Sequence, residues 1–132
     1  MIQTKSIVHF TIPVRDLERS LEFYTGVLGM TLIRKYSNMA FLRSGEDDRI
    51  TILGVSDAFH ENHGKETLIH HAYAVDPDKY DAALQFARDN GYEVLREEDR
   101  TSPATIAGPR FYIHDPDRNV IEILNWSNPG EF

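Results

Sequence analysis

Residues Gly108–Trp126, GPRFYIHDPDRNVIEILNW, contain two strand-like runs separated by a turn rich in Asp, Pro and Asn. The runs are Arg110–Ile113 and Val120–Leu124. In the second run a single charged residue, Glu122, stands between two isoleucines. Because a carboxylate is costly to bury unless a cation neutralises it, we expect a cationic partner for Glu122.

Length and composition are those of one ordinary globular domain. The 132 residues are 41% hydrophobic and 27% charged, with a net charge of −7. That acidity argues against nucleic-acid partners and anionic membrane surfaces, which require a basic face. The absence of cysteine excludes a disulfide scaffold, a thiolate metal site and a cysteine nucleophile. With no signal-peptide pattern and no apolar run of about 20 residues, we expect a cytoplasmic protein without a membrane span.

The chain carries an internal repeat, β-α-β-β-β followed by the same order of elements. The first copy is predicted as a strand at Ile7–Val14, a helix capped by Asp16 that ends near Gly29, and strands at Met30–Tyr36, Met39–Arg43 and Arg49–Val55. The second copy is predicted as a strand at Thr67–Val75, a helix capped by Asp76 with Pro77 at its first position, a strand at Tyr92–Arg96, a polar connection at Glu97–Ala107, and the two runs within Gly108–Trp126.

We therefore predict an α+β fold in one domain, residues 1–132. Module 1 covers 1–56, a linker 57–66, module 2 67–126 and a short tail 127–132. The two βαβββ modules are expected to form a curved, mostly antiparallel sheet around a metal or ligand cavity.

The register of the repeat brings three possible metal ligands to matching positions. An offset of 61 residues aligns His9 with His70, and ITIL (50–53) aligns with IEIL (121–124), so that Thr51 is the counterpart of Glu122. Two imidazoles and one carboxylate are the ligand set of open Fe(II) sites, and Mn(II) fits it as well. Zn(II) also fits, with water at the vacant position. Each histidine taken alone is better explained as a surface or core residue, but the matched positions favour a metal site.

One of these assignments has an alternative. The helix-ending glycines are 62 residues apart, an offset that pairs His9 with His71 in place of His70. We prefer His70, because Ala72 and Ala74 on its side of the strand leave room for a ligand.

The motifs together resemble a known family. The opening His before R-D-L-x-x-S-x-x-F-Y-x-x-x-L-G-M, the H-x-A-x-x-V strand and F-Y-x-x-D-P-D-x-N-x-I-E-I resemble the vicinal oxygen chelate superfamily over nearly the whole chain. That superfamily includes glyoxalase I, type I extradiol dioxygenases, fosfomycin-resistance enzymes and bleomycin-resistance proteins. The resemblance implies a divalent metal on His9, His70 and Glu122, a small-molecule substrate that chelates it through adjacent oxygens, and a homodimer. It leaves open whether one chain or two supply the ligands.

Departures from the family pattern bear on the reaction. Bacterial glyoxalase I resembles this chain but has a fourth ligand, a Glu, where Thr51 stands, which disfavours a four-ligand Ni(II) or Zn(II) site. We assign Thr51 to substrate binding instead. Fosfomycin-resistance enzymes use a basic residue beyond the last strand, and the tail Ser127–Phe132 has none. Bleomycin-binding members lack the ligand triad that this chain has.

Extradiol dioxygenases have the same ligand triad and a tyrosine ten residues before the Glu, the spacing of Tyr112 from Glu122. We therefore expect Tyr112 to be catalytic, through a hydrogen bond to a substrate oxygen or proton transfer, although it also fits a cavity-lining role. Arg110 shares its face and is expected to bind an anionic substrate group or to form a salt bridge at the rim.

The leading hypothesis is a ring-cleaving dioxygenase with Fe(II) or Mn(II). The alternatives are a glutathione-linked lyase or transferase, glyoxalase-like or fosfomycin-resistance-like, and a non-catalytic drug- or metabolite-binding protein.

Overall fold

The structure is a computed structural model that describes residues 1, 3, 8–55, 69–102 and 106–129. The chain divides into two compact units, residues 1–61 and 62–132, each with one four-stranded sheet. Among the described residues, no helix is long and apolar enough to cross a bilayer. The expected linker at residues 57–66, with His60 and His63, lies outside the described part of the chain.

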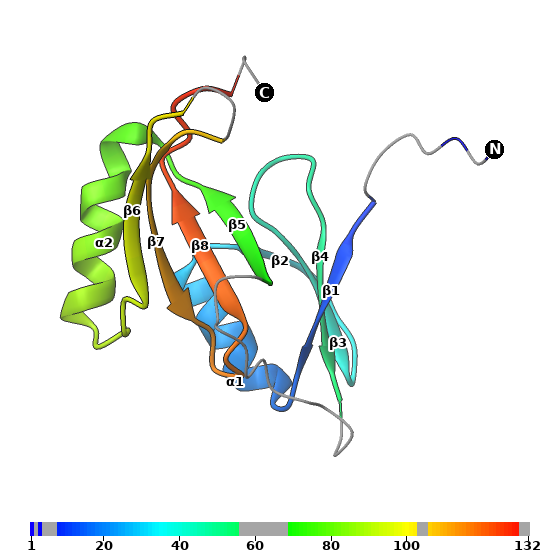
Figure 1. Ribbon diagram of the computed structural model, residues 1–132. Helices are drawn as coiled ribbons and strands as arrows, with labels where there is room; N and C mark the ends of the chain where they lie inside the picture. Colours follow the sequence, from blue (N-terminus) through cyan, green and yellow to red (C-terminus); the bar gives the residue numbers. More distant parts are fainter. Residues whose placement is uncertain (2, 4–7, 56–68, 103–105, 130–132) are drawn as a thin grey trace. The chain divides into compact units, whose positions relative to one another are not determined.

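The first unit holds the first copy of the repeat (Figure 1). Its elements are β1 (Phe10–Val14), α1 (Leu17–Glu22), a π-helical turn η1 (Phe23–Val27), β2 (Thr31–Lys35), β3 (Met39–Arg43) and β4 (Ile50–Gly54). The strand order is β1-β4-β3-β2, and β1 is parallel to β4 while the other pairs are antiparallel. The expected helix cap is confirmed, since the Asp16 carboxylate accepts the backbone N–H of Arg19 at 3.1 Å.

The second unit repeats this topology. Its elements are β5 (His70–Ala74), a 3₁₀ turn η2 (Pro77–Lys79), α2 (Tyr80–Asp89), β6 (Arg96–Arg100), β7 (Gly108–His114) and β8 (Val120–Leu124). The order is β5-β8-β7-β6, with β5 parallel to β8 and antiparallel pairs elsewhere. The predicted α+β class and the two βαβββ modules are confirmed, with the strands divided between two sheets.

Asp76 is the N-cap and Pro77 the first residue of the helical segment, as predicted, although the segment begins as the η2 turn and the Asp76 side chain makes no cap hydrogen bond. One prediction for the second copy was wrong. The strand expected at Tyr92–Arg96 is shifted along the chain to Arg96–Arg100, within the segment expected to be a connection. That sequence, REEDR, has no apolar residue, and the strand is formed by its antiparallel pairing with β7.

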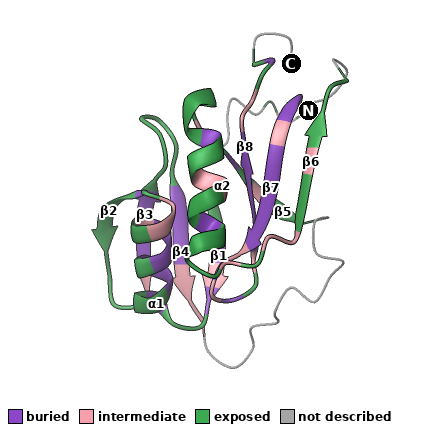
Figure 2. Cartoon of the chain, turned by 90° about the vertical axis from the view of Figure 1, so that its left-hand side faces the viewer, coloured by how far each residue is buried: buried purple, intermediate pink, exposed green. Residues whose placement is uncertain are grey.

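One face of each sheet carries the apolar core. In the first unit, Ile12, Leu42, Ile50 and Ile52 are fully buried, and α1 packs against β3 and β4. In the second unit every residue of β8 is buried, while β6 and, in the first unit, β2 are mostly exposed (Figure 2).

Gly108 begins β7 at a position where only glycine fits. Its φ is +122°, a value that side chains rarely tolerate, and a Cβ atom would lie 1.9 Å from the carbonyl oxygen of Asn125. The close approach keeps the start of β7 against the chain that follows β8, and so positions Arg110 and Tyr112, which follow on the same strand.

Candidate metal and substrate site

The candidate site lies on one face of the second sheet. In the strand register Glu122 stands opposite Ala72 on β5 and opposite Tyr112 on β7. Residues paired across strands share a face, as do residues two apart on one strand, so His70, Arg110, Tyr112 and Glu122 all lie on this face. The first sheet pairs Thr11 with Thr51 in the same way. The equivalence of Thr51 with Glu122 thus agrees with the strand pairing, whereas His9 lies just before β1, outside the paired residues.

His70 and Glu122 are in contact. Nε2 of His70 lies 2.8 Å from Oε2 of Glu122, whose side chain is only 3% exposed. His71 occupies the next position on β5 and is paired with Ile121, on the opposite face. There burial lowers the pKa of His71. The histidine that faces Glu122 is therefore His70.

Arg110 supplies the cation that the sequence required for Glu122. Its Nη1 donates to Oε1 of Glu122 at 2.8 Å, and the Arg110 side chain is 2% exposed, so the expected place on the rim was wrong. The remaining groups of the guanidinium are also used within the chain: Nε and Nη2 donate to the carbonyl of Gly108, and Nη2 also donates to the carbonyl of Ile106. This pattern orients Glu122 by a buried ion pair, which differs from the expected contact with an anionic substrate.

Tyr112, which is paired with Glu122 in the strand register, is hydrogen-bonded to a second carboxylate. The Tyr112 hydroxyl donates to Oε1 of Glu98 at 3.1 Å, and its ring stands edge-on to His70 with ring centroids 5.7 Å apart. Burial, the charge of Glu122 and the interaction with Glu98 raise the pKa of Tyr112 to about 12. At neutral pH this phenol is protonated, so it can donate a hydrogen bond but is a poor general base.

Glu98 is a site residue that the sequence analysis missed. It accepts hydrogen bonds from Arg96 at 2.6 Å and from Arg100 at 2.7 Å, besides the one from Tyr112. Burial raises the pKa of Glu98, but the hydrogen bonds from Arg100 and Tyr112 and the charges of Arg100 and Arg96 outweigh it, and the net shift is downward. The signal in the sequence was the alternating sign of the charges on Arg96, Glu98 and Arg100, which lie two residues apart and so share one face of a strand.

The pair of His70 and Glu122 fits a divalent metal ion by its chemistry. Two ligand atoms of one ion with bonds of about 2.1 Å lie about 3 Å apart, close to the observed spacing. Across residues 8–55, 69–102 and 106–129 no group of three His, Cys, Asp or Glu side chains that could hold a metal is found. His9, the third expected ligand, is exposed and stands just before β1 in the first unit. Its part in the site stays a prediction.

Thr51 is buried in β4, with 5% of its surface exposed. Its Oγ1 has no hydrogen-bond partner among the residues that the structure describes. A buried hydroxyl without a partner costs about 1–3 kcal/mol, so this atom is suited to a ligand that accepts or donates there.

The family model of the Glyoxalase/Bleomycin resistance protein/Dioxygenase superfamily matches residues 6–123. The chain belongs to this superfamily. The match spans both units, in agreement with the duplicated strand order.

Curated relatives of the chain are enzymes of glutathione chemistry. A lactoylglutathione lyase of Salmonella typhimurium is 32% identical over 136 residues, covering 94% of this chain and 95% of the relative. The glutathione transferase FosA of Serratia marcescens is 26% identical over 120 residues, covering 90% of this chain and 79% of the relative. Relatives of this kind make an enzyme the expected class of protein.

Among solved structures, a mutant form of the fosfomycin resistance protein FosX from Listeria monocytogenes matches with a TM-score of 0.71. It is 19% identical and covers 96% of this chain and 95% of its own. That protein was crystallised with Mn(II) and 1S,2S-dihydroxypropylphosphonic acid. At this identity the likeness establishes the fold alone.

Proposed function

We propose that this protein is a metal-dependent enzyme that acts on a small molecule bound through two adjacent oxygens, in glutathione-linked lyase or transferase chemistry. The observation that carries the proposal is the 2.8 Å contact between His70 and Glu122, with Arg110 bound to the other oxygen of Glu122. The lyases and transferases among the relatives support this class over the ring-cleaving dioxygenase favoured by the sequence.

The metal would be held by His9, His70 and Glu122, with Fe(II) or Mn(II) favoured by this ligand set and Zn(II) or Ni(II) as alternatives. When bound, such an ion acts as a Lewis acid for charge that develops on substrate oxygens. The Mn(II) in the FosX structure supports a divalent ion.

Residues of the chain supply the rest of the site. Arg110 fixes the orientation of Glu122 and neutralises its charge. Tyr112 keeps its proton at neutral pH, and its hydroxyl would donate that proton to a substrate oxygen by turning away from Glu98, its hydrogen-bond acceptor in this structure. Thr51 offers its buried hydroxyl to the substrate. The isosteric change Thr51→Val should raise KM with little effect on folding.

The ligand assignment is tested by the metal content of protein purified without added metal. Glu122→Gln and His70→Gln should lose the metal and keep the fold. Glu98→Gln and His71→Gln are the matched controls and should retain it, because neither side chain is an expected ligand. Full metal occupancy in Glu122→Gln would overturn the assignment.

The reaction class is tested by assaying Mn(II)-, Fe(II)-, Ni(II)- and Zn(II)-loaded protein with the methylglyoxal–glutathione hemithioacetal, with fosfomycin plus glutathione, and with a catechol panel. We expect turnover in one of the two glutathione assays. A ring-cleavage chromophore with a catechol, and no turnover with glutathione, would reinstate the dioxygenase hypothesis. Ligand binding that survives exhaustive chelation, without any turnover, would instead identify a binding protein.

We also propose a cytoplasmic homodimer, as the family resemblance implies. Light scattering coupled to size exclusion tests the dimer, and a monomer at micromolar concentration would contradict it.

A further inference from the structure

A second candidate binding site lies within the first unit. A pocket of about 280 Å³ is lined by Ile33 and Arg34 of β2, Tyr36, Phe41 of β3 and Arg49. It is on the face of the sheet that carries Thr51, since Arg34 pairs with Phe41 and Phe41 with Thr51. It contains none of the expected metal ligands.

The charges in this pocket are of one sign. Arg34 donates to the Tyr36 hydroxyl at 3.5 Å, and Arg49 donates to the backbone carbonyl of Asp48 at 2.5 Å. In the part of the chain that the structure describes, neither guanidinium contacts a carboxylate, whereas Arg88 and Arg96, for example, are each paired. In a protein of net charge −7, two arginines without acidic partners beside one pocket favour an anionic ligand.

The rest of the lining is apolar and partly open to solvent. Tyr36 and Ile33 are each 45% exposed, and the rings of Tyr36 and Phe41 meet edge to face with centroids 6.1 Å apart. Arginine guanidinium groups together with aromatic rings suit a molecule that combines an anionic group with a planar or apolar part. The volume is slightly below the range for small-molecule sites, which begins at about 300 Å³, so the occupant is a small molecule or one end of a larger one.

We propose that this pocket binds a small organic anion, with its carboxylate or phosphonate on Arg34 and Arg49 and its apolar part against Tyr36 and Phe41. The inference goes beyond the proposed function, because it requires neither the metal nor the residues around Glu122. It assigns an anion-binding role to Arg34 and Arg49, two residues of the first unit for which the resemblance supplied no role.

The test is an NMR titration of metal-free protein in EDTA with benzoate, with phenylphosphonate and with inorganic phosphate. Saturable shifts of the backbone amides of Arg34, Tyr36 and Phe41 are expected with at least one organic anion, with a dissociation constant on the order of 1–10 mM. The first two probes separate carboxylate from phosphonate recognition. Inorganic phosphate, which lacks an apolar part, should bind on the order of tenfold more weakly.

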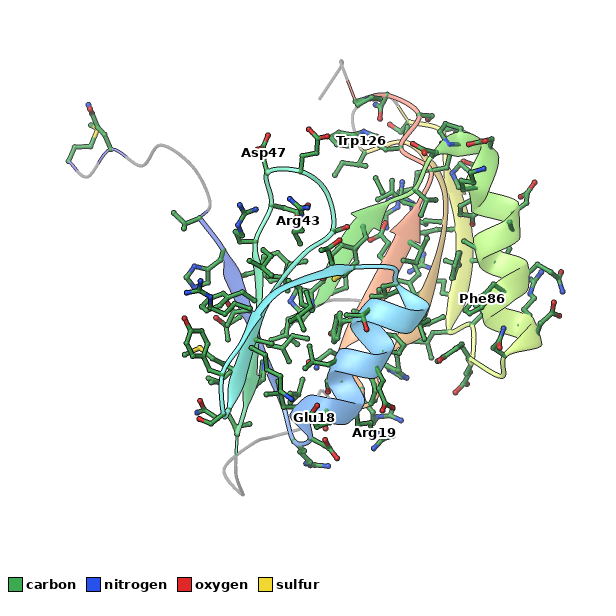
Figure 3. All side chains as sticks on the ribbon, turned by 180° about the vertical axis from the view of Figure 1, so that it is seen from behind. Glu18, Arg19, Arg43, Asp47, Phe86 and Trp126 are labelled. Carbon is green, nitrogen blue, oxygen red and sulfur yellow. The ribbon has the colours of Figure 1, made fainter. Side chains whose placement is uncertain are left out.

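Variants decide which residues are responsible. Arg34→Gln and Arg49→Gln should each weaken binding by about tenfold, as loss of a hydrogen bond to a charged group does. Arg43→Gln is the matched control. Arg43 lies two residues beyond Phe41 on the same side of β3, near the turn that carries Asp47 (Figure 3). It is not part of the pocket lining, so its replacement by Gln removes the same charge outside the pocket. It should alter the affinity by less than about twofold.

Three results would overturn the proposal: no saturable shift with either organic anion, equal binding of inorganic phosphate, or an equal loss of affinity in Arg43→Gln. Its failure is distinguishable from failure of the proposed function, because metal content and turnover are measured on the same protein samples. Glu122→Gln, which should lose the metal, should bind the organic anion with unchanged affinity.

Discussion

Replacing Arg110 by methionine should destabilise the protein far more than an ordinary arginine substitution. The change keeps an unbranched side chain of similar length in the core but removes the cation from Glu122. That carboxylate belongs to a residue that is 2% exposed, so water cannot replace the lost partner. His70 would be its one remaining charged or polar neighbour among the ion pairs of the described residues.

The magnitude follows from what the substitution leaves unpaired. Breaking a buried ion pair by removing one partner costs about 3–5 kcal/mol. The carbonyls of Gly108 and Ile106 lose their Arg110 donors as well, which places the expected loss toward the upper end of that range. A domain of this size has a free energy of unfolding of about 5–15 kcal/mol, so the variant should fold but be visibly weakened.

Urea denaturation in EDTA measures the effect without a contribution from bound metal. The matched control is Arg96→Met, which removes an arginine from the same face of the sheet. The side chain of Arg96 is 52% exposed. Its pairing with Glu98 is a surface ion pair, so its loss should cost no more than about 1 kcal/mol. A double-mutant cycle with Glu122→Gln should give a coupling energy of about 2 kcal/mol between Arg110 and Glu122.

Two outcomes would refute this reasoning. A cost for Arg110→Met no larger than that of the Arg96→Met control would mean that the guanidinium is not buried against Glu122 in solution. Additive effects of Arg110→Met and Glu122→Gln would mean that the two groups do not interact.

Three further predictions concern pH, backbone geometry and metal. Because the pKa of Glu98 is lower in the folded protein than its ordinary value of 4.5, its stabilising contribution is present above about pH 4.5 and is lost as the pH falls. Urea titrations from pH 6 to pH 3 should therefore show a steeper loss of stability in the wild type than in Glu98→Gln, and parallel curves would contradict the assigned network. Gly108→Ala forces a Cβ against the Asn125 carbonyl and should cost at least about 2 kcal/mol, whereas Gly26→Ala, where a Cβ meets nothing within 4 Å, should be neutral or slightly stabilising in thermal melts. Mn(II) at about 100 times its Kd should stabilise the wild type by ~2.7 kcal/mol and leave Glu122→Gln unaffected; an equal rise in Tm for both would place the ion elsewhere.

The sequence predicted the strands whose side chains alternate between core and site. The bounds of β3 and β8 agree with the prediction, because apolar residues on these strands are bounded by turn residues on both sides. The repeat offset also predicted that His70 would face Glu122. That inference needed only the two-residue period of a strand and the alignment of the two modules.

The incorrect predictions for Arg110 and for strand β6 have a common physical cause. Arg110 was expected to bind an anionic substrate group or to form a salt bridge at the rim, because arginine is rarely buried, and the sequence cannot reveal that carbonyls of the chain lie within reach of its donors. Strand β6 was missed because strand prediction relies on apolar alternation, whereas REEDR derives its conformation from hydrogen bonds to β7. Contacts made by charged side chains across strands depend on tertiary placement, and local sequence carries little information about them.

The charged sequence of β6 has a consequence for the behaviour of the protein in concentrated solution. β6 is the last strand of its sheet, with β7 on one side and no strand of the second sheet, as far as the structure describes it, on the other. An open strand edge offers unpaired backbone groups to any extended chain that approaches it, which is a route to intermolecular sheet formation. The uninterrupted charges of REEDR oppose such an approach, since a second copy aligned strand to strand would have to bring these charges together and desolvate them. The charges of β6, a segment expected from the sequence to be largely a connecting loop, thus reduce the tendency of the sheet to aggregate through its open edge.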